Sequence, residues 1–175
     1  LGSSANLYGT LSGSDVDTGN TKTYGISSPT SSSANYTSSA SGSAVTYNIS
    51  KTGSYGTLYI ESATGNYLYV ADAAAVNAIP FGTNPSDVFS VTVSDGIATT
   101  SQTYTINLTG ANDAPTLAAV TAGSVADAQN SAALGSSANL YGTLSGSDVD
   151  TGNTKTYGIS SPTSSSANYT SSASG

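Results

Sequence analysis

Short segments in which apolar and polar residues alternate run along most of the chain. Val88–Val93 shows the pattern most clearly, because Val91 and Val93 alternate with Thr92 and Ser94. Alternation with a period of two is typical of a β-strand that buries one of its faces. The same pattern predicts about seven strands, at Leu7–Leu11, Lys22–Ile26, Val45–Ile49, Tyr55–Ile60, Tyr67–Val70, Val88–Val93 and Gln102–Leu108.

Turn residues between these segments predict how the strands connect. Glu61–Gly65 is suited to a hairpin between the fourth and fifth strands, and Asp95-Gly96 lies between the last two. A short helix is expected near Asp72–Ala78 with Asp72 as its N-cap, and the Ser/Thr-rich tract Ser27–Ser43 predicts a long exposed loop. Short strands separated by turns are typical of an immunoglobulin-like β-sandwich, so we predict an all-β fold.

The alternation also predicts which side chains point into the core. In each strand either the residues named here or their immediate neighbours should face inward, because successive side chains point to opposite faces. The predicted inward residues are Leu58, Ile60, Leu68, Val70, Phe89, Val91, Val93, Ile106 and Leu108.

A long identical repeat determines the expected domain organisation. Residues Leu1–Gly42 recur without change as Leu134–Gly175, so the sequence has a period of 133 residues. Repetition at a fixed spacing indicates an array of like units, and this period suits a whole domain better than a solenoid repeat. The sequence therefore predicts β-domains in a tandem array.

Composition excludes several classes of function. The chain has 3 Lys and Arg residues against 10 Asp and Glu residues, a net charge of −7, which argues against nucleic-acid partners. No apolar run is long enough to span a bilayer, so no membrane insertion is expected. The chain contains no His and no Cys, which excludes a Ser–His triad and a thiol nucleophile. Paired carboxylates could hydrolyse glycosides, but no Trp is present as a sugar platform, and we predict that the chain is not an enzyme.

Several motifs carry a resemblance to a known family. Val91–Gly96 followed by Gln102–Pro115 resembles the end of a VCBS repeat, a cadherin-like module of very large bacterial surface proteins. Further similarity lies at Gly9–Asp17, Tyr55–Leu58, Ala63–Gly65 and Asp72–Ala78. The resemblance implies an immunoglobulin/cadherin-like β-sandwich in a protein secreted to the bacterial cell surface or extracellular matrix. There it would act as a stalk or spacer in cell adhesion and biofilm.

The resemblance also places the boundary between modules near Asn112–Pro115. Residues 1–111 would then form most of one module without its opening strand, and residues 112–175 the linker and opening part of the next module. Neighbouring repeat modules are the expected partners. Either the chain belongs to a longer array, or it forms a homopolymer by exchanging strands head to tail.

Calcium is the expected cofactor, because hard cations bind several carboxylate and carbonyl oxygens. Asp15-Val16-Asp17 and its copy Asp148-Val149-Asp150 each place two carboxylates on one side of an extended segment. In cadherin-like chains a similar pair meets an Asn-Asp linker. The resemblance therefore implies a ligand set of Asp15, Asp17, Asp72, Asp95, Asn112, Asp113, Asp148 and Asp150.

Two alternatives stay open from the sequence. The acidic residues in loops could be turn formers that bond their own backbone, and Asp72 could serve only as a helix cap. The chain could also be a glycan- or protein-binding module that uses the Ser27–Ser43 loop or its tyrosine-bearing faces.

Overall fold

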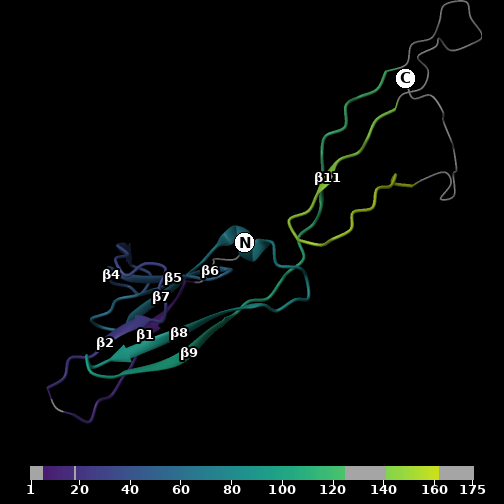
Figure 1. The fold of residues 1–175 in the computed structure, drawn as a ribbon. Coiled ribbons are helices and arrows are strands. Elements are labelled where there is room, and N and C mark those ends of the chain that lie inside the picture. Colours follow the sequence, from purple (N-terminus) through teal and green to yellow (C-terminus); the bar gives the residue numbers. More distant parts are fainter. Residues whose placement is uncertain (1–5, 18, 125–140, 162–175) are drawn as a thin grey trace, which may run out of the picture. The chain divides into compact units, whose positions relative to one another are not determined.

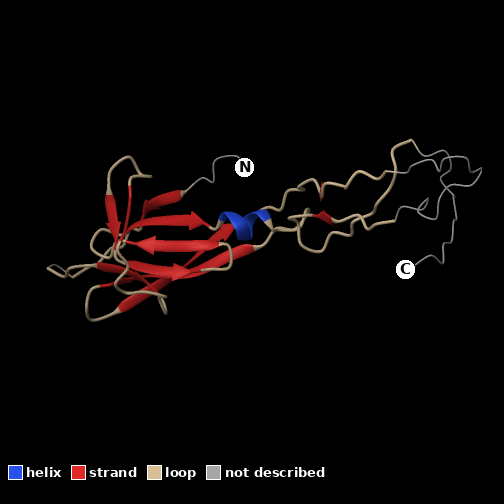
Figure 2. Ribbon diagram, turned by 90° about the horizontal axis from the view of Figure 1, so that it is seen from above, coloured by secondary structure: helices blue, strands red, loops and turns tan. Residues whose placement is uncertain are grey.

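The computed structural model describes residues 6–17, 19–124 and 141–161, which fall into two compact units. Unit 1 comprises Leu1–Asp113 together with Val149–Gly152, and unit 2 comprises Ala114–Asp148 together with Asn153–Gly175. Antiparallel strands form nearly all the regular structure (Figures 1 and 2). The prediction of an all-β fold is confirmed.

Two antiparallel sheets make up most of unit 1 (Figure 1). The predicted strands appear with ends shifted by a few residues, except for the third strand. The first sheet has the order β1-β7-β6-β5 and consists of β1 (Leu7–Thr10), β5 (Ile49–Thr52), β6 (Gly56–Ile60) and β7 (Asn66–Ala71). The second has the order β2-β8-β9 and consists of β2 (Thr23–Ile26), β8 (Ser86–Ser94) and β9 (Thr99–Asn107).

The two sheets share one hydrophobic core. Burying apolar side chains from both sheets removes their surface from water, which is the main favourable term in folding. Of the residues predicted to point inward, Val70 and Val93 are only half-buried and Leu108 packs at the margin. The core consists of Ile26, Leu58, Ile60, Tyr69, Phe89, Val91 and Ile106.

A third layer covers the opposite face of the first sheet. Leu68 is fully buried although its neighbour Tyr69 points into the main core, so β7 buries both faces. Leu68 pairs with Tyr59, which places both on the outer face. There the ring of Tyr36 stacks on Tyr59 at 4.3 Å, and Tyr47 lies beside both rings.

The hairpin that supplies this layer corrects two predictions. It pairs β3 (Tyr36–Ser38) with β4 (Val45–Tyr47), so the Ser27–Ser43 tract is not one long exposed loop. The predicted strand Val45–Ile49 is correct only for Val45–Tyr47, because Asn48 separates β4 from β5. Asn48 forms a corner: its side chain exchanges hydrogen bonds with Ser62 at 2.8 Å in both directions.

The remaining elements are short. Helix α1 (Ala73–Asn77) is the helix expected near Asp72–Ala78, and the Asp72 carboxylate caps it by accepting from the N–H groups of Ala74 and Ala75. In unit 2, β10 (Thr116–Leu117) pairs with β11 (Gly146–Ser147). Among the described residues, no helix has the length and apolar character needed to cross a membrane. Parts of the second repeat copy, residues 134–140 and 162–175, lie outside the described residues.

Candidate functional site

Asp15 and Asp95 both bond to backbone N–H groups in their own turns. Asp15 Oδ1 accepts from the N–H of Asp17 at 2.9 Å, and Asp95 Oδ1 accepts from Ala98 at 2.6 Å and Ile97 at 2.8 Å. The hydrogen bonds from Ala98 and then Ile97 lower the pKa of the Asp95 carboxyl below its usual value, because they favour the charged form.

The same two carboxylates share a shallow hollow with a cation. Asp15, Asp95 and the ammonium-bearing Lys22 all line it. A lysine that already offsets the negative charge makes this hollow less suited to a divalent cation than two carboxylates alone would be. Asp72 lies elsewhere, at the start of α1, where its Oδ1 accepts the two hydrogen bonds that cap the helix.

Asp150 and Asp113 are brought together within unit 1. Asp150 is buried, and its Oδ2 accepts from the backbone N–H of Asp113 at 2.8 Å. Next to it, the hydroxyl of Thr151 donates to the carbonyl oxygen of Ala78, one residue beyond α1, at 3.0 Å. The neighbouring Asn112 is exposed and donates to the carbonyl of Asp113. These contacts fasten Val149–Gly152, which come from the second repeat, to the end of unit 1.

The identical segment of the first repeat has a different environment. Val16, the counterpart of Val149, is 98 % exposed, and Asp17, the counterpart of Asp150, is also exposed. Within the part of the chain that the structure describes, the Asp17 carboxylate accepts no hydrogen bond. Asp150 is therefore packed into unit 1, whereas the identical residue of the first repeat, Asp17, is exposed.

The same contrast holds a few residues earlier. In unit 2, Gly146 and Ser147 pair with Leu117 and Thr116, and Ala118 donates to the Ser145 carbonyl at 2.8 Å. The counterpart segment Ser12–Ser14 has no backbone hydrogen bond to any described residue. Among the described residues, this segment therefore has a strand partner in the second copy and none in the first.

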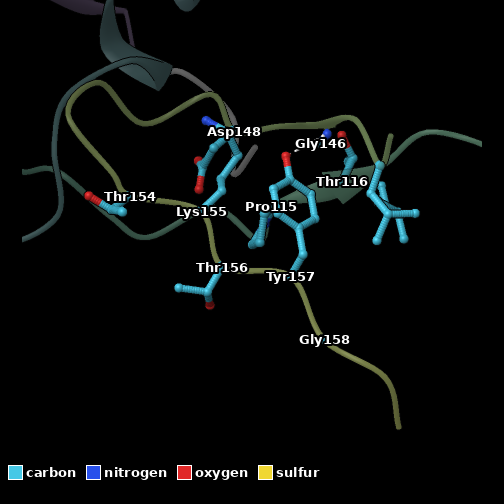
Figure 3. A pocket seen from close by; sticks show the side chains of 11 residues that line it. Pro115, Thr116, Gly146, Asp148, Thr154, Lys155, Thr156, Tyr157 and Gly158 are labelled. Carbon is cyan, nitrogen blue, oxygen red and sulfur yellow. Dashed lines mark hydrogen bonds between the residues drawn. The ribbon is translucent and has the colours of Figure 1, made fainter. Parts of the chain in front are cut away.

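Unit 2 has a hollow of about 350 Å³ beside β11 (Figure 3). Gly146 and Tyr157 line it, and the Gly146 N–H donates to the Tyr157 hydroxyl at 3.1 Å. Their counterparts in unit 1, Gly13 and Tyr24, are covered by Val93 of β8: Tyr24 pairs with Val93, and a Cβ added at Gly13 would meet Val93 Cγ2 at 2.8 Å. The hollow thus corresponds to the surface that β8 covers in unit 1.

The predicted calcium ligands do not gather into one cluster among the described residues. Among residues 6–17, 19–124 and 141–161, no three acidic side chains gather as metal ligands. Calcium favours six to eight oxygen ligands, so the oxygens of one or two acids are too few. Asp113 and Asp150 are close, and Asp15 and Asp95 share a hollow, but Asp148 belongs to unit 2. Calcium binding stays a prediction.

Asp87 is a buried acid that the sequence analysis missed. It is 4 % exposed, and its carboxylate accepts hydrogen bonds from the Tyr69 hydroxyl and from the N–H groups of Ser54 and Tyr55. Its signal was present in the sequence, because Asp87 stands in the same alternating phase as the inward-facing Phe89 and Val91. A charged residue in an inward phase predicts a satisfied buried carboxylate.

Comparisons of the chain with protein-family models, with curated proteins and with solved structures found no match.

Proposed function

We propose that the chain is a stretch of tandem, VCBS-like β-modules that acts as a non-enzymatic spacer in a bacterial adhesin or extracellular matrix fibre. The proposed module is an immunoglobulin/cadherin-like sandwich, and two antiparallel sheets that share one core support this. The family resemblance is what supports secretion to the cell surface.

One observation carries the proposal. Val149–Gly152 belong to the second repeat by sequence but to unit 1 by their contacts: Thr151 donates to the carbonyl of Ala78 beside α1, and Asp150 accepts from the linker residue Asp113. Each repeat would thus contribute a few residues to the packing of the repeat before it. A chain of modules joined in this way can serve as a spacer and needs no catalytic group.

Length scaling tests the spacer function. The 175-residue chain is compared by small-angle X-ray scattering with chains extended by one and two further 133-residue periods. A spacer should increase its maximum dimension by a constant amount with each period. Modules that collapse onto one another would give a dimension that hardly grows, which would contradict the proposal. The same scattering with calcium and with chelator tests whether calcium extends the array, as the family resemblance predicts.

A glycan- or protein-binding module is the competing function. A glycan array probed with the 175-residue chain distinguishes the two, because a spacer should give no saturable binding. Saturable binding that is lost on replacing Tyr36, whose ring is half-buried on the outer layer, would favour the binding module instead.

A further inference from the structure

We propose that Tyr36 and Tyr59 form an oxidative cross-linking site, at which hydrogen peroxide, acting through a haem peroxidase, joins the two rings in a dityrosine. The new bond would tie the β3–β4 hairpin covalently to the first sheet of unit 1. This modification goes beyond the spacer function and does not depend on it, since it needs only contacts within unit 1.

Tyr36 and Tyr59 have the closest ring contact among the described tyrosines. Their ring centroids are 4.3 Å apart and the ring planes differ by 17°, so the two faces lie against each other. Tyr36 belongs to β3 and Tyr59 to β6, and both side chains are half-buried rather than enclosed. The pair therefore brings two phenols from separate elements together near the surface of unit 1.

The composition of the chain directs oxidation to tyrosine. The chain contains no Cys, Met, Trp or His, which are the other side chains that oxidants attack readily, and it contains 12 Tyr. A one-electron oxidant therefore meets no competing side chain of this kind. The phenol rings are the groups on which an unpaired electron comes to rest.

Two one-electron oxidations complete the reaction. Each phenol gives up one electron and its hydroxyl proton, and the unpaired electron of the phenoxyl radical spreads onto the Cε carbons beside the oxygen. A bond between one Cε of each ring joins the radicals, and the hydrogen on each of these carbons then moves to the oxygen and restores the phenols. The peroxide accepts the two electrons and two protons and becomes two molecules of water. The protein loses two hydrogen atoms in all.

The position of Tyr36 allows the rings to reach the bonding geometry. A dityrosine joins its rings edge to edge, so one ring has to turn out of the stack. Tyr36 lies in a strand of only three residues on the outer face of the first sheet, where its ring can turn without disturbing the main core. Tyr67 and Tyr104 also touch, with centroids 5.1 Å apart and planes at 61°. Both of these pack against the core between the sheets, where close packing resists such a turn.

The cross-link would hold a layer that has no strand ladder to the first sheet. Within the described residues, β3 pairs with β4 alone in a two-stranded sheet. A covalent bond from β3 to β6 closes the chain between them and reduces the freedom of the unfolded state. The hairpin could then no longer separate from the sheet, so the oxidised protein should open less often at this layer.

Oxidation of the full chain with hydrogen peroxide and a haem peroxidase, at a concentration low enough to limit reaction between chains, tests the site. The expected product is a monomer that has lost two hydrogen atoms and shows dityrosine fluorescence, which no Trp emission obscures. Cleavage after Lys51 should leave the peptides on its two sides joined, because Tyr36 precedes Lys51 and Tyr59 follows it. Hydrogen exchange in β3 should be slower in the cross-linked chain.

Three Tyr→Phe variants locate the bond, since each keeps its ring and loses only the hydroxyl. Tyr36→Phe and Tyr59→Phe should each abolish the product within the chain. Tyr47→Phe is the matched control: the Tyr47 centroid lies 6.4 Å from that of Tyr36 and 6.3 Å from that of Tyr59, so this variant should keep the yield. A product that persists in Tyr59→Phe, or one that is lost equally in Tyr47→Phe, would overturn the proposal. So would an unmodified chain that forms cross-links only between molecules, or none at all.

Discussion

The hydroxyl of Tyr69 donates a hydrogen bond of 2.8 Å to the buried carboxylate of Asp87, which joins the two sheets of unit 1 through their core. The same carboxylate accepts from the N–H groups of Ser54 and Tyr55, in the turn between β5 and β6. Gly53 is required beside them, since any Cβ there would overlap the Asp87 carboxylate. One acid thus organises a turn and an intersheet contact.

Asp87→Ala should destabilise the chain by about 3 kcal/mol, because it leaves three donors without their acceptor. Asp87→Asn keeps one carbonyl oxygen and should cost about half as much. Urea denaturation of the full chain measures both losses. The matched control is Asp17→Asn, an exposed acid whose replacement should change stability by less than about 0.5 kcal/mol. An Asp87→Ala variant as stable as this control would show that the carboxylate is dispensable.

Alkaline pH should unfold the protein through its tyrosines. Burial, and next the hydrogen bond to Asp87, raises the pKa of Tyr69 far above its usual value of 10.0. Burial and the hydrogen bond with Tyr67 raise the pKa of Tyr104 to about 12. A group whose pKa is higher in the folded state stabilises the protein fully below the unfolded pKa and loses that contribution above it. Stability should therefore fall as the pH rises from 10 toward 12.

Tyrosinate absorbance and circular dichroism, followed together over this pH range, check the prediction. Tyr104→Phe should reduce the alkaline loss of stability, whereas Tyr8→Phe, at a position that is 52 % exposed, should leave it unchanged. Coincidence of ionisation with unfolding is expected. Ionisation of every tyrosine without any loss of structure would contradict the prediction.

Regular alternation allowed the sheets to be predicted, but it could not reveal the third layer. The strands of unit 1 were found because they present a periodic apolar face, as Phe89 and Val91 do. β3 lies in a tract of Ser, Thr and Asn where Tyr36 is the only large apolar side chain. Its strand depends on tertiary contacts, the stack on Tyr59 and the Thr37–Thr46 hydroxyl contact across the hairpin, which no local pattern encodes.

Tyr47→Ala should remove most of what the third layer contributes, at a cost of about 3–4 kcal/mol, because Tyr47 is only 1 % exposed and leaves a large cavity. The variant should expose Leu68 and Tyr59 while the core between the two main sheets persists. Hydrogen exchange would then rise in β3 and β4 and stay low in β8. Ser43→Ala, at an exposed position just before β4, serves as control. A loss of protection shared by all strands would show that the hairpin is not a separate layer.

The candidate site could be predicted only in part, because an acidic residue in a loop can either form a turn or bind calcium, and the sequence does not distinguish the two roles. The family resemblance implied that Asp113 and Asp150 are calcium ligands, whereas the bond between them in the structure joins the Asp150 carboxylate to the backbone N–H of Asp113. That bond requires the two segments to be adjacent in space. Only the comparison of identical copies reveals that Asp17 and Asp150 differ in environment.

Variants of Asp72 distinguish a helix-capping role from a calcium-binding role. As an N-cap it accepts from Ala74 and Ala75, so Asp72→Ala should cost about 1 kcal/mol, while Asp72→Asn should cost almost nothing because Asn caps equally well. Both losses should be the same in calcium and in chelator, measured as free energies of unfolding. A calcium ligand would behave differently, because Asn removes a negative charge and should weaken the site only when the metal is present. A destabilisation of Asp72→Asn that appears with calcium and vanishes with chelator would therefore assign Asp72 to a metal site.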